Sequence, residues 1–161
     1  MKFSVNREAL LRPLTIVAGA VERRQTMPIL SNLLIIASGN KLVITGTDLE
    51  VELSATIILD DAAETNGDIT VPARKFVDIC KSLPDSCDIS FSLDQGKAVV
   101  KSGRSRYTLA TLAAADFPSV QKDESSFSAT VNQGDFAQLI DRTAFSMAQQ
   151  DVRYYLNGML W

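Results

Sequence analysis

Hydrophobic and polar residues alternate in short segments over most of the first 125 residues. Alternation over four to eight residues is typical of strands that bury one face. Turn-forming pairs such as Gly39-Asn40 and Ser102-Gly103 separate these segments. The pattern predicts eight strands, at residues 2–5, 33–37, 41–45, 51–58, 69–71, 89–93, 98–101 and 107–111.

A helical pattern follows the first predicted strand. Asn6 is a favourable N-cap residue, and apolar side chains recur after it at the spacing of one helical face. Pro13 lies inside the pattern, so we expect a kink there. The residues predicted to face the core are Leu10, Leu14, Val17 and Val21.

A second helical pattern follows the strand predicted at 69–71. It begins at Pro72, because proline suits the first helical position, and it stops before Pro84. One side of this helix carries Phe76, Ile79, Cys80 and Leu83. Each predicted helix therefore comes directly after a short strand.

The chain repeats its own pattern. A shift of 66 residues places Leu10 on Phe76, and a shift of 126 residues places Asn6 on Asn132. We therefore predict an α+β fold of two strand-helix-strands repeats, with helices on one face of antiparallel sheets. Residues 1–125 form this first domain, and 126–161 begin a truncated second copy with one strand, a helix at about 132–147 and the start of another strand. The polar stretch 120–128 reads as a linker.

Composition limits the class of protein. Of the 161 residues, 46% are hydrophobic and 22% are charged, which is typical of a globular chain. The start of the chain has no signal-peptide core, and no uncharged apolar run approaches the roughly 20 residues of a membrane span. We therefore expect a cytoplasmic protein with no membrane partner.

Catalytic chemistry finds little support in the sequence. The chain has no histidine, which removes the commonest general base, the histidine-containing triads and most zinc sites. Cys80 and Cys87 read as buried small hydrophobic residues, with a redox role as the less favoured alternative. An enzyme using serine, aspartate or Cys80 stays a weak hypothesis, so we expect no catalytic residue, metal or cofactor.

Charge is segregated along the chain, although the net charge is only -3. Residues 48–68 contain seven carboxylates and neither lysine nor arginine. Solvated faces would explain any one charge, but together with the repeats the pattern favours helices that offer basic side chains to phosphate. The basic residues fall in three groups: Arg7, Arg12, Arg23 and Arg24; Arg74, Lys75 and Lys81; and Lys101, Arg104 and Arg106.

Several long stretches resemble the bacterial DNA polymerase III beta clamp family: MKFSVNREALLRPL, MPILSNLLI, GTDLEVEL, TVPARKFVDICKSLP, VKSGRSRYTLATLAAADFP and FSMAQQDVRYYLNGML. The resemblance covers nearly the whole chain. It implies a ring of two head-to-tail subunits, each with three domains of one fold, with helices lining the hole. Such a ring encircles duplex DNA without reading its sequence and confers processivity on the replicative polymerase, and it makes or breaks no bond.

The resemblance also implies site residues. DNA contacts are expected at Arg24 and Gln150, with Tyr154 and Tyr155 beside them, and the basic helices and loop add Arg7, Arg23 and Arg74. The subunit interface is expected at Lys75, Ile79, Leu83, Arg104, Arg106, Tyr107 and Leu109, although core packing is nearly as good a reading of Ile79, Leu83 and Leu109. Part of a pocket for peptides of DNA polymerase III and clamp-loader subunits is expected at Arg153, Tyr155 and Leu156.

The resemblance leaves an alternative function open. The end of the second domain and the whole third domain are missing from these residues. A naturally shortened clamp could act as a binding or decoy module for clamp or loader proteins and not encircle DNA. A reading frame that continues after Trp161 would argue against this alternative.

Overall fold

The computed structural model describes residues 1–21, 27–118 and 128–160. The chain divides into two compact units, Met1–Gln121 and Lys122–Trp161. Arg23 and Arg24, two of the expected DNA contacts, lie outside the described residues.

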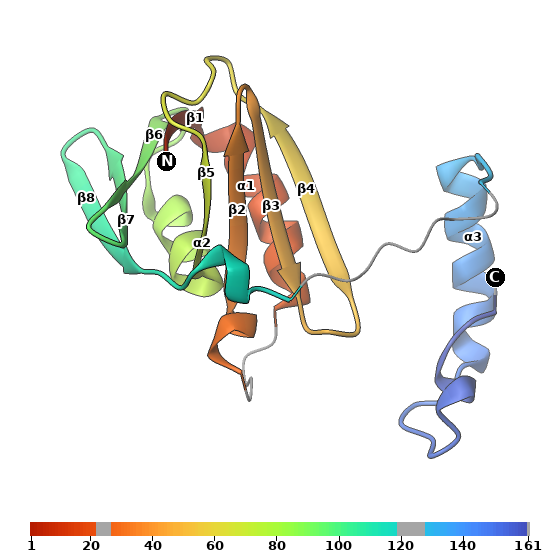
Figure 1. Ribbon diagram of the computed structural model, residues 1–161. Helices are drawn as coiled ribbons and strands as arrows, with labels where there is room; N and C mark the ends of the chain where they lie inside the picture. Colours follow the sequence, from red (N-terminus) through yellow and green to blue (C-terminus); the bar gives the residue numbers. More distant parts are fainter. Residues whose placement is uncertain (22–26, 119–127, 161) are drawn as a thin grey trace. The chain divides into compact units, whose positions relative to one another are not determined.

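Two four-stranded antiparallel sheets make up the strand layer of the first unit (Figure 1). Their strand orders are β1-β6-β7-β8 and β4-β3-β2-β5. The strands are β1 (Lys2–Asn6), β2 (Asn32–Ser38), β3 (Lys41–Thr47), β4 (Glu52–Ile58), β5 (Gly67–Pro72), β6 (Asp88–Asp94), β7 (Lys97–Ser102) and β8 (Ser105–Ala110). All eight predicted strands are confirmed, with ends that move by no more than two residues.

The two repeats exchange their first strands. β1 belongs to the first repeat but pairs with β6 of the second, where Phe3 lies opposite Phe91. β5 begins the second repeat but pairs with β2 of the first, where Val71 lies opposite Leu33. Each sheet therefore combines one strand of one repeat with three strands of the other.

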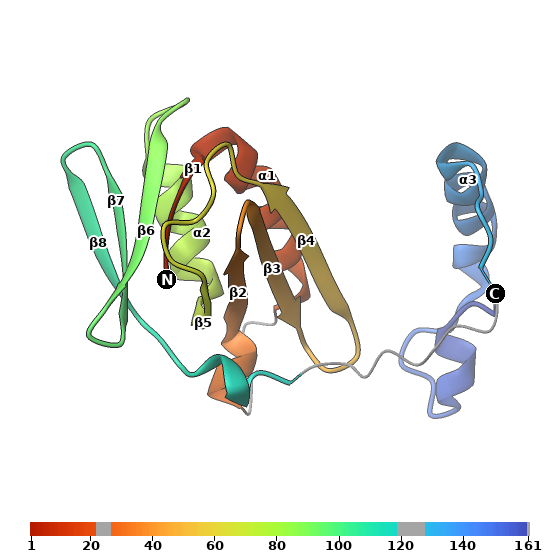
Figure 2. The ribbon, with the colours of Figure 1, turned by 45° about the horizontal axis from the view of Figure 1, so that its top comes forward.

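Helices α1 (Arg7–Val17) and α2 (Ala73–Ser82) follow the two exchanged strands and cover the same side of the sheets (Figures 1 and 2). The Asn6 side chain caps α1 by accepting a 3.0 Å hydrogen bond from the Glu8 amide. α2 begins one residue later than predicted, with Pro72 at its N-cap. Pro13 lies inside α1, and the kink there stays a prediction.

The end of α1 differs from the prediction. The helix stops at Val17 and a 3₁₀ turn, Ala18–Ala20, follows, so Val21 packs partly buried against the core from outside the helix. The helix end approaches β3 at Gly46, where an added Cβ would lie 2.9 Å from the Val17 carbonyl oxygen. Only glycine allows this close approach without a shift of the backbone.

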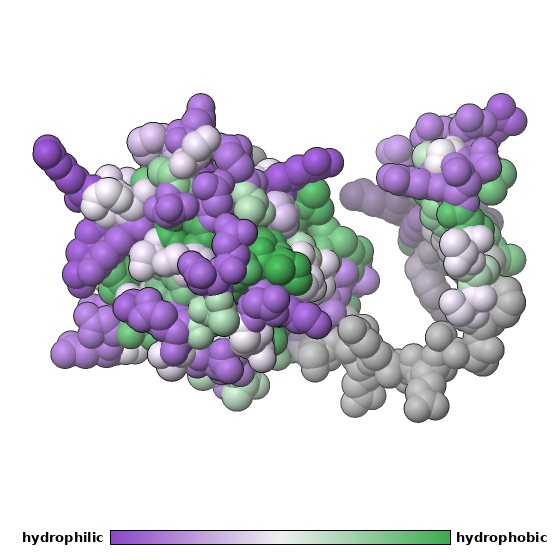
Figure 3. Space-filling view, turned by 90° about the horizontal axis from the view of Figure 1, so that it is seen from above, coloured by the Kyte–Doolittle hydropathy of each residue, from purple (hydrophilic) through white to green (hydrophobic). Residues whose placement is uncertain are grey.

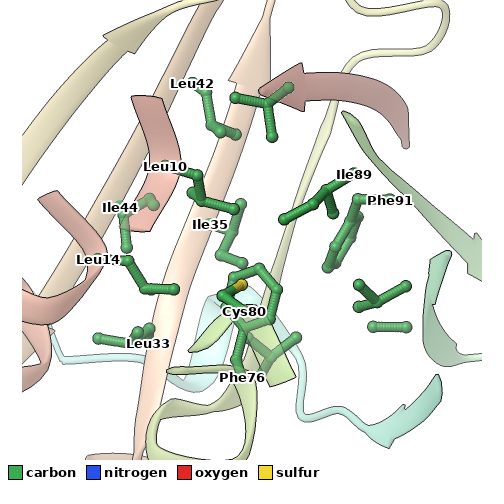
Figure 4. Close-up of a cluster of buried hydrophobic side chains, with 14 of the residues drawn as sticks. Leu10, Leu14, Leu33, Ile35, Leu42, Ile44, Phe76, Cys80, Ile89 and Phe91 are labelled. Atoms are coloured by element: carbon green, nitrogen blue, oxygen red, sulfur yellow. The ribbon is translucent and has the colours of Figure 1, made fainter. Parts of the chain in front are cut away.

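One hydrophobic core fills the space between the helices and the sheets (Figure 4). The aromatic rings of Phe3 and Phe91 stack with centroids 5.0 Å apart, and Phe76 meets Phe91 edge-on. Positions that the 66-residue shift aligns belong to this same core, including Leu10 and Phe76, and Leu14 and Cys80. The predicted α+β fold of two repeats is confirmed for the first unit.

The second unit reproduces the start of the first in its local structure. The 126-residue shift carries α1 onto α3 (Gln133–Thr143), and the turn Ala18–Ala20 onto Ala144–Ser146. It also carries the 3₁₀ turn Pro28–Ser31 onto Tyr154–Asn157. Asn132 caps α3 by accepting from the Gly134 amide at 2.9 Å, as Asn6 caps α1.

The strands predicted for the second copy are absent from its described residues. Neither 128–132 nor 158–160 forms a strand. β1 and β2 form because β6, β3 and β5 supply hydrogen-bond partners, and residues 128–160 contain no counterparts of those strands. None of residues 128–160 is buried, and hydrophobic residues lie on the surface of this unit (Figure 3).

Candidate nucleic-acid and partner-binding surfaces

A shallow groove runs between α1 and α2 on the exposed side of the helices. It consists of two adjoining hollows that share Thr15 and Lys81 as lining residues. Arg12 and Ile16 line one hollow and Arg74 lines the other. The structure thus places basic side chains from both repeats along one groove, with Arg12 and Lys81 beside the expected Arg74.

The exposed charges of the helical layer are mostly positive. Two exposed carboxylates, Glu8 and Asp78, are outnumbered there by four exposed cations: Arg12, Arg74, Lys75 and Lys81. The seven carboxylates of residues 48–68 lie outside α1 and α2, on β4, β5 and the loops beside them. A net positive helical surface on a chain of net charge -3 suits an extended polyanion such as a phosphate backbone.

Arg7 does not reach this groove. Its side chain is only 10% exposed, and its Nε donates to the Cys80 carbonyl at 2.9 Å. Its Nη1 lies 2.8 Å from carboxylate oxygens of both Glu8 and Asp85. Arg7 therefore joins the start of α1 to the end of α2, and the structure does not bring it together with the exposed cations.

The loop of residues 148–157 (the 148–157 loop) carries the other expected DNA contacts. Gln150 is exposed and adopts the left-handed conformation with a φ of 58°. Tyr154 and Tyr155 are exposed, and their rings meet edge-on with centroids 6.0 Å apart. The aromatic rings are accessible to a ligand here, because none of the described residues of the second unit is buried.

Beside this loop lies an open pocket against α3. Its lining includes Leu139 and Thr143 of α3 and Tyr155, Leu156 and Met159 after the loop. Arg153 is not among the lining residues, because its guanidinium bonds to the Asp151 carboxylate. The structure thus brings together two of the three expected pocket residues and turns Arg153 toward Asp151.

The expected subunit interface maps to α2 and its C-cap, Leu83, and to the edge strand β8 with the turn before it, which carries Arg104. Lys75, Arg104 and Arg106 are exposed, while Ile79 and Tyr107 are partly buried against the core. Leu83 and Leu109 are each only 4% exposed and belong to the core of the first unit. For these two leucines the structure favours the core-packing reading over a place on an exposed surface.

Cys80 behaves as a buried hydrophobic residue. Burial raises the pKa of its thiol to about 12, so the reactive thiolate is scarce near neutral pH. Cys87 is partly buried.

In the described part of the chain, no group of three or more histidine, cysteine or carboxylate side chains is arranged to hold a metal ion. The helices of that part are also too short or too polar to cross a membrane.

Sequence reasoning missed the residues that order these surfaces. Asp85 pairs with Arg7 across 78 positions, and Asp151 and Asn157 bond to each other within the 148–157 loop. For the 148–157 loop the available signal was Asp151 two residues before Arg153, a spacing that allows the two side chains to pair. The Arg7 contacts with Cys80 and Asp85 offered no local signal, because both residues lie in the other repeat.

Comparison with known proteins places these features in context. The family model described as DNA polymerase III beta subunit, N-terminal domain, matches residues 1–121. The beta sliding clamp of Pseudomonas aeruginosa is 58% identical over 160 residues, which are 99% of this chain and 43% of that protein. The Vibrio cholerae beta sliding clamp is 50% identical over 161 residues, the whole of this chain and 44% of the relative.

Solved structures give the same result. The crystal structure of the DNA polymerase III subunit beta from Pseudomonas aeruginosa matches with a TM-score of 0.95 at 57% identity, covering 99% of this chain and 43% of that one. The DNA polymerase sliding clamp from Caulobacter crescentus matches with a TM-score of 0.92 at 39% identity, covering 98% and 43%. The chain therefore spans less than half the length of the relatives it matches.

Proposed function

This chain belongs to the DNA polymerase III beta subunit family, and from that premise we propose that it forms part of a sliding clamp on duplex DNA. In this proposal the clamp encircles the duplex and tethers the replicative polymerase, so its effect is topological and no bond is made or broken. Residues 1–125 are the first clamp domain and 126–161 begin the second. The site of action is chromosomal DNA in the bacterial cytoplasm. The comparisons do not favour the decoy alternative.

The observation that carries this proposal is the positive groove between α1 and α2. Arg12, Arg74 and Lys81 line this groove from helices that two different repeats supply, and all three are exposed. Exposed lysine and arginine side chains contact phosphate through charge, without reading base sequence. Such contacts are weak enough individually for a protein to slide along the duplex.

The proposed DNA contacts are a subset of the expected ones. We retain Arg74 in the groove and Gln150, Tyr154 and Tyr155 on the 148–157 loop, all of which are exposed. Arg23 and Arg24 stay in the proposal on the family resemblance alone, since they lie outside the described residues. We leave out Arg7, because its guanidinium is buried and occupied by Glu8, Asp85 and the Cys80 carbonyl.

The proposed head-to-tail contact between subunits lies on α2 and β8. An edge strand has unpaired backbone groups that a strand of another chain can complete. Arg106 on β8, Arg104 in the turn before it and Lys75 on α2 give this surface a positive charge that would suit an acidic partner surface. Ile79 and Tyr107 supply its partly exposed apolar centre, and Leu83 and Leu109 support it from the core.

The proposed partners of the second unit are peptide segments of the polymerase and the clamp loader. Tyr155 and Leu156 line the open pocket beside α3. In this proposal Arg153, two residues before Tyr155, contacts the bound peptide from the rim of the pocket. Aromatic and aliphatic side chains of this kind are the usual anchors for short apolar peptides.

A hybrid protein tests the proposal. This chain replaces the equivalent 160 residues of the Pseudomonas aeruginosa beta sliding clamp, which supplies the rest of its length. The hybrid is loaded on nicked circular DNA by the cognate clamp loader, and retention is measured before and after the DNA is linearised. We expect retention on circles and loss on linear DNA, because a closed ring leaves only over an end.

Matched charge reversals separate the groove from the rest of the surface. Arg74→Glu is expected to shorten the time that the hybrid stays on circular DNA and to reduce the salt dependence of binding by roughly 0.9 in the log-log slope, the value of one phosphate contact. Lys41→Glu, on β3 of the sheet layer, is expected to leave both unchanged. Equal retention on circular and linear DNA, or equal effects of the two reversals, would contradict the proposal.

A further inference from the structure

Asp151 is the centre of the hydrogen bonds that close the 148–157 loop. Its Oδ1 accepts from the Arg153 amide at 2.8 Å and from Arg153 Nε at 3.0 Å. Its Oδ2 accepts from Arg153 Nη2 at 2.9 Å. This two-pronged contact fixes both the position and the plane of the guanidinium. The Asp151 side chain is 25% exposed and the Arg153 side chain 61%, so the carboxylate is sheltered while the cation faces solvent.

The backbone of Asp151 is held from the other end of the loop. Its amide donates to Asn157 Oδ1 at 3.0 Å, and its carbonyl accepts from Asn157 Nδ2 at 3.1 Å. The Asn157 side chain thus acts on Asp151 as a neighbouring strand would. The Ala148 amide donates to the Leu156 carbonyl at 2.9 Å and completes the closure.

These bonds hold a conformation that the chain would not keep by itself. Gln150 precedes Asp151 and lies in the left-handed region, which disfavours side chains other than glycine. A residue stays in that region when its surroundings fix it. No residue within 128–160 is fully buried, so packing can supply only part of this restraint.

We propose that Asp151 is a positioning residue, which holds the 148–157 loop closed so that Gln150 and Arg153 face their ligands in a fixed orientation. The inference deepens the proposed function and rests on it, because the ligands are duplex DNA and partner peptides. Asp151 itself contacts neither ligand. Asn157 completes the same lock through the backbone.

The charge state of Asp151 agrees with this role. The Arg153 side chain first, and then the Arg153 amide, hold the pKa of the Asp151 carboxyl below its ordinary value. Since the pKa is lowered in the closed loop, the closing interaction is present above the ordinary carboxyl pKa. It is lost only as the pH falls through the lowered value. The loop is therefore closed throughout the neutral range.

Amide exchange on the 161-residue chain tests the positioning step. Asp151→Asn is expected to speed exchange of the Ala148 and Arg153 amides about tenfold, because charged hydrogen bonds are lost at the closing contact. Asp141→Asn removes an exposed carboxylate from α3 and is expected to change neither rate.

A pH titration tests the same contact. In the unchanged chain, the Arg153 Nε–H resonance should shift on acidification with a midpoint below the ordinary aspartate pKa, and Asp151→Asn should abolish that shift. An unchanged exchange rate or an unaltered titration in Asp151→Asn would overturn the proposal.

Retention of the hybrid clamp on circular DNA tests the consequence. Asp151→Asn is expected to speed its loss about threefold, since a loosened loop must be ordered again on binding. Asp141→Asn is expected to behave like the parent. A faster amide exchange with unchanged retention would overturn the role in ligand presentation. Failure of the parent hybrid to remain on circular DNA would instead contradict the proposed clamp function, and the exchange and titration results would still decide the positioning step.

Discussion

Helices α1 and α3 have the same local structure and very different surroundings. Each is eleven residues long, begins after a capping asparagine and ends in a three-residue 3₁₀ turn. Leu10 of α1 is fully buried, whereas Phe136 at the same place on α3 is 36% exposed. The same capped amphipathic pattern therefore gives the same helix in both units, but burial of its apolar face, which supplies most of a helix's stability, requires strands that lie far away in the sequence.

The largest expected effect comes from shortening the equivalent core residue in each helix. Leu14→Ala should lower the free energy of unfolding of the first unit by about 3 kcal/mol, because it leaves a cavity among fully buried side chains. Ile140→Ala should change stability by less than about 0.5 kcal/mol, as is usual at positions without a packed environment. Urea unfolding followed by circular dichroism measures both. Similar losses would mean that α3 is packed as well as α1.

A smaller effect is expected at the first residue of each helix. Arg7→Met should cost the first unit about 2 kcal/mol, since the Cys80 carbonyl and two carboxylates lose a buried charged donor. Gln133→Met, at the same place on α3, should cost almost nothing, because the side chain is exposed. Thermal unfolding of the two variants provides the measurement. A stable Arg7→Met protein with weakened DNA binding would instead return Arg7 to the DNA contacts.

The smallest effect concerns the caps. Asn6→Ala should lower the stability of the first unit by about 1 kcal/mol, the usual cost of a lost N-cap. Asn132→Ala removes the same kind of hydrogen bond from α3, but its effect should be confined to faster amide exchange in the first turn of that helix. Urea unfolding and amide exchange on the same samples test the contrast. A drop in global stability from Asn132→Ala would show that the two units unfold together.

Much of the fold was predictable because each repeat shows its strands and helix as alternation and helical spacing over neighbouring residues. The 126-residue shift predicted α3, and alternation predicted each strand of the first unit. Alternation indicates which face of a strand is buried but not which strand lies beside it, so the exchange of β1 and β5 between the repeats was not predicted. The strands expected in the second copy did not form for the same reason: a strand needs its neighbours.

The candidate surfaces were less predictable than the fold. The exposed cations of α2 follow from helical spacing, but the burial of Arg7 depends on the distant Asp85. Leu83 and Leu109 are core residues in this chain, although the family resemblance suggested an interface. Sequence alone cannot separate a side chain that supports a surface from one that forms it, since both are apolar and lie on the same elements.

The exchange of first strands also determines when the chain can fold during its synthesis. Phe3 must pair with Phe91, so β1 waits during synthesis for a partner that emerges 88 residues later. The sheet β4-β3-β2-β5 needs only residues 32–72, but the sheet β1-β6-β7-β8 stays incomplete until residues 88–110 have emerged. The core that both sheets share therefore cannot close before then. Such non-local pairing slows folding and makes it all-or-none. The first unit is therefore expected to need protection by a chaperone until its last strand has left the ribosome.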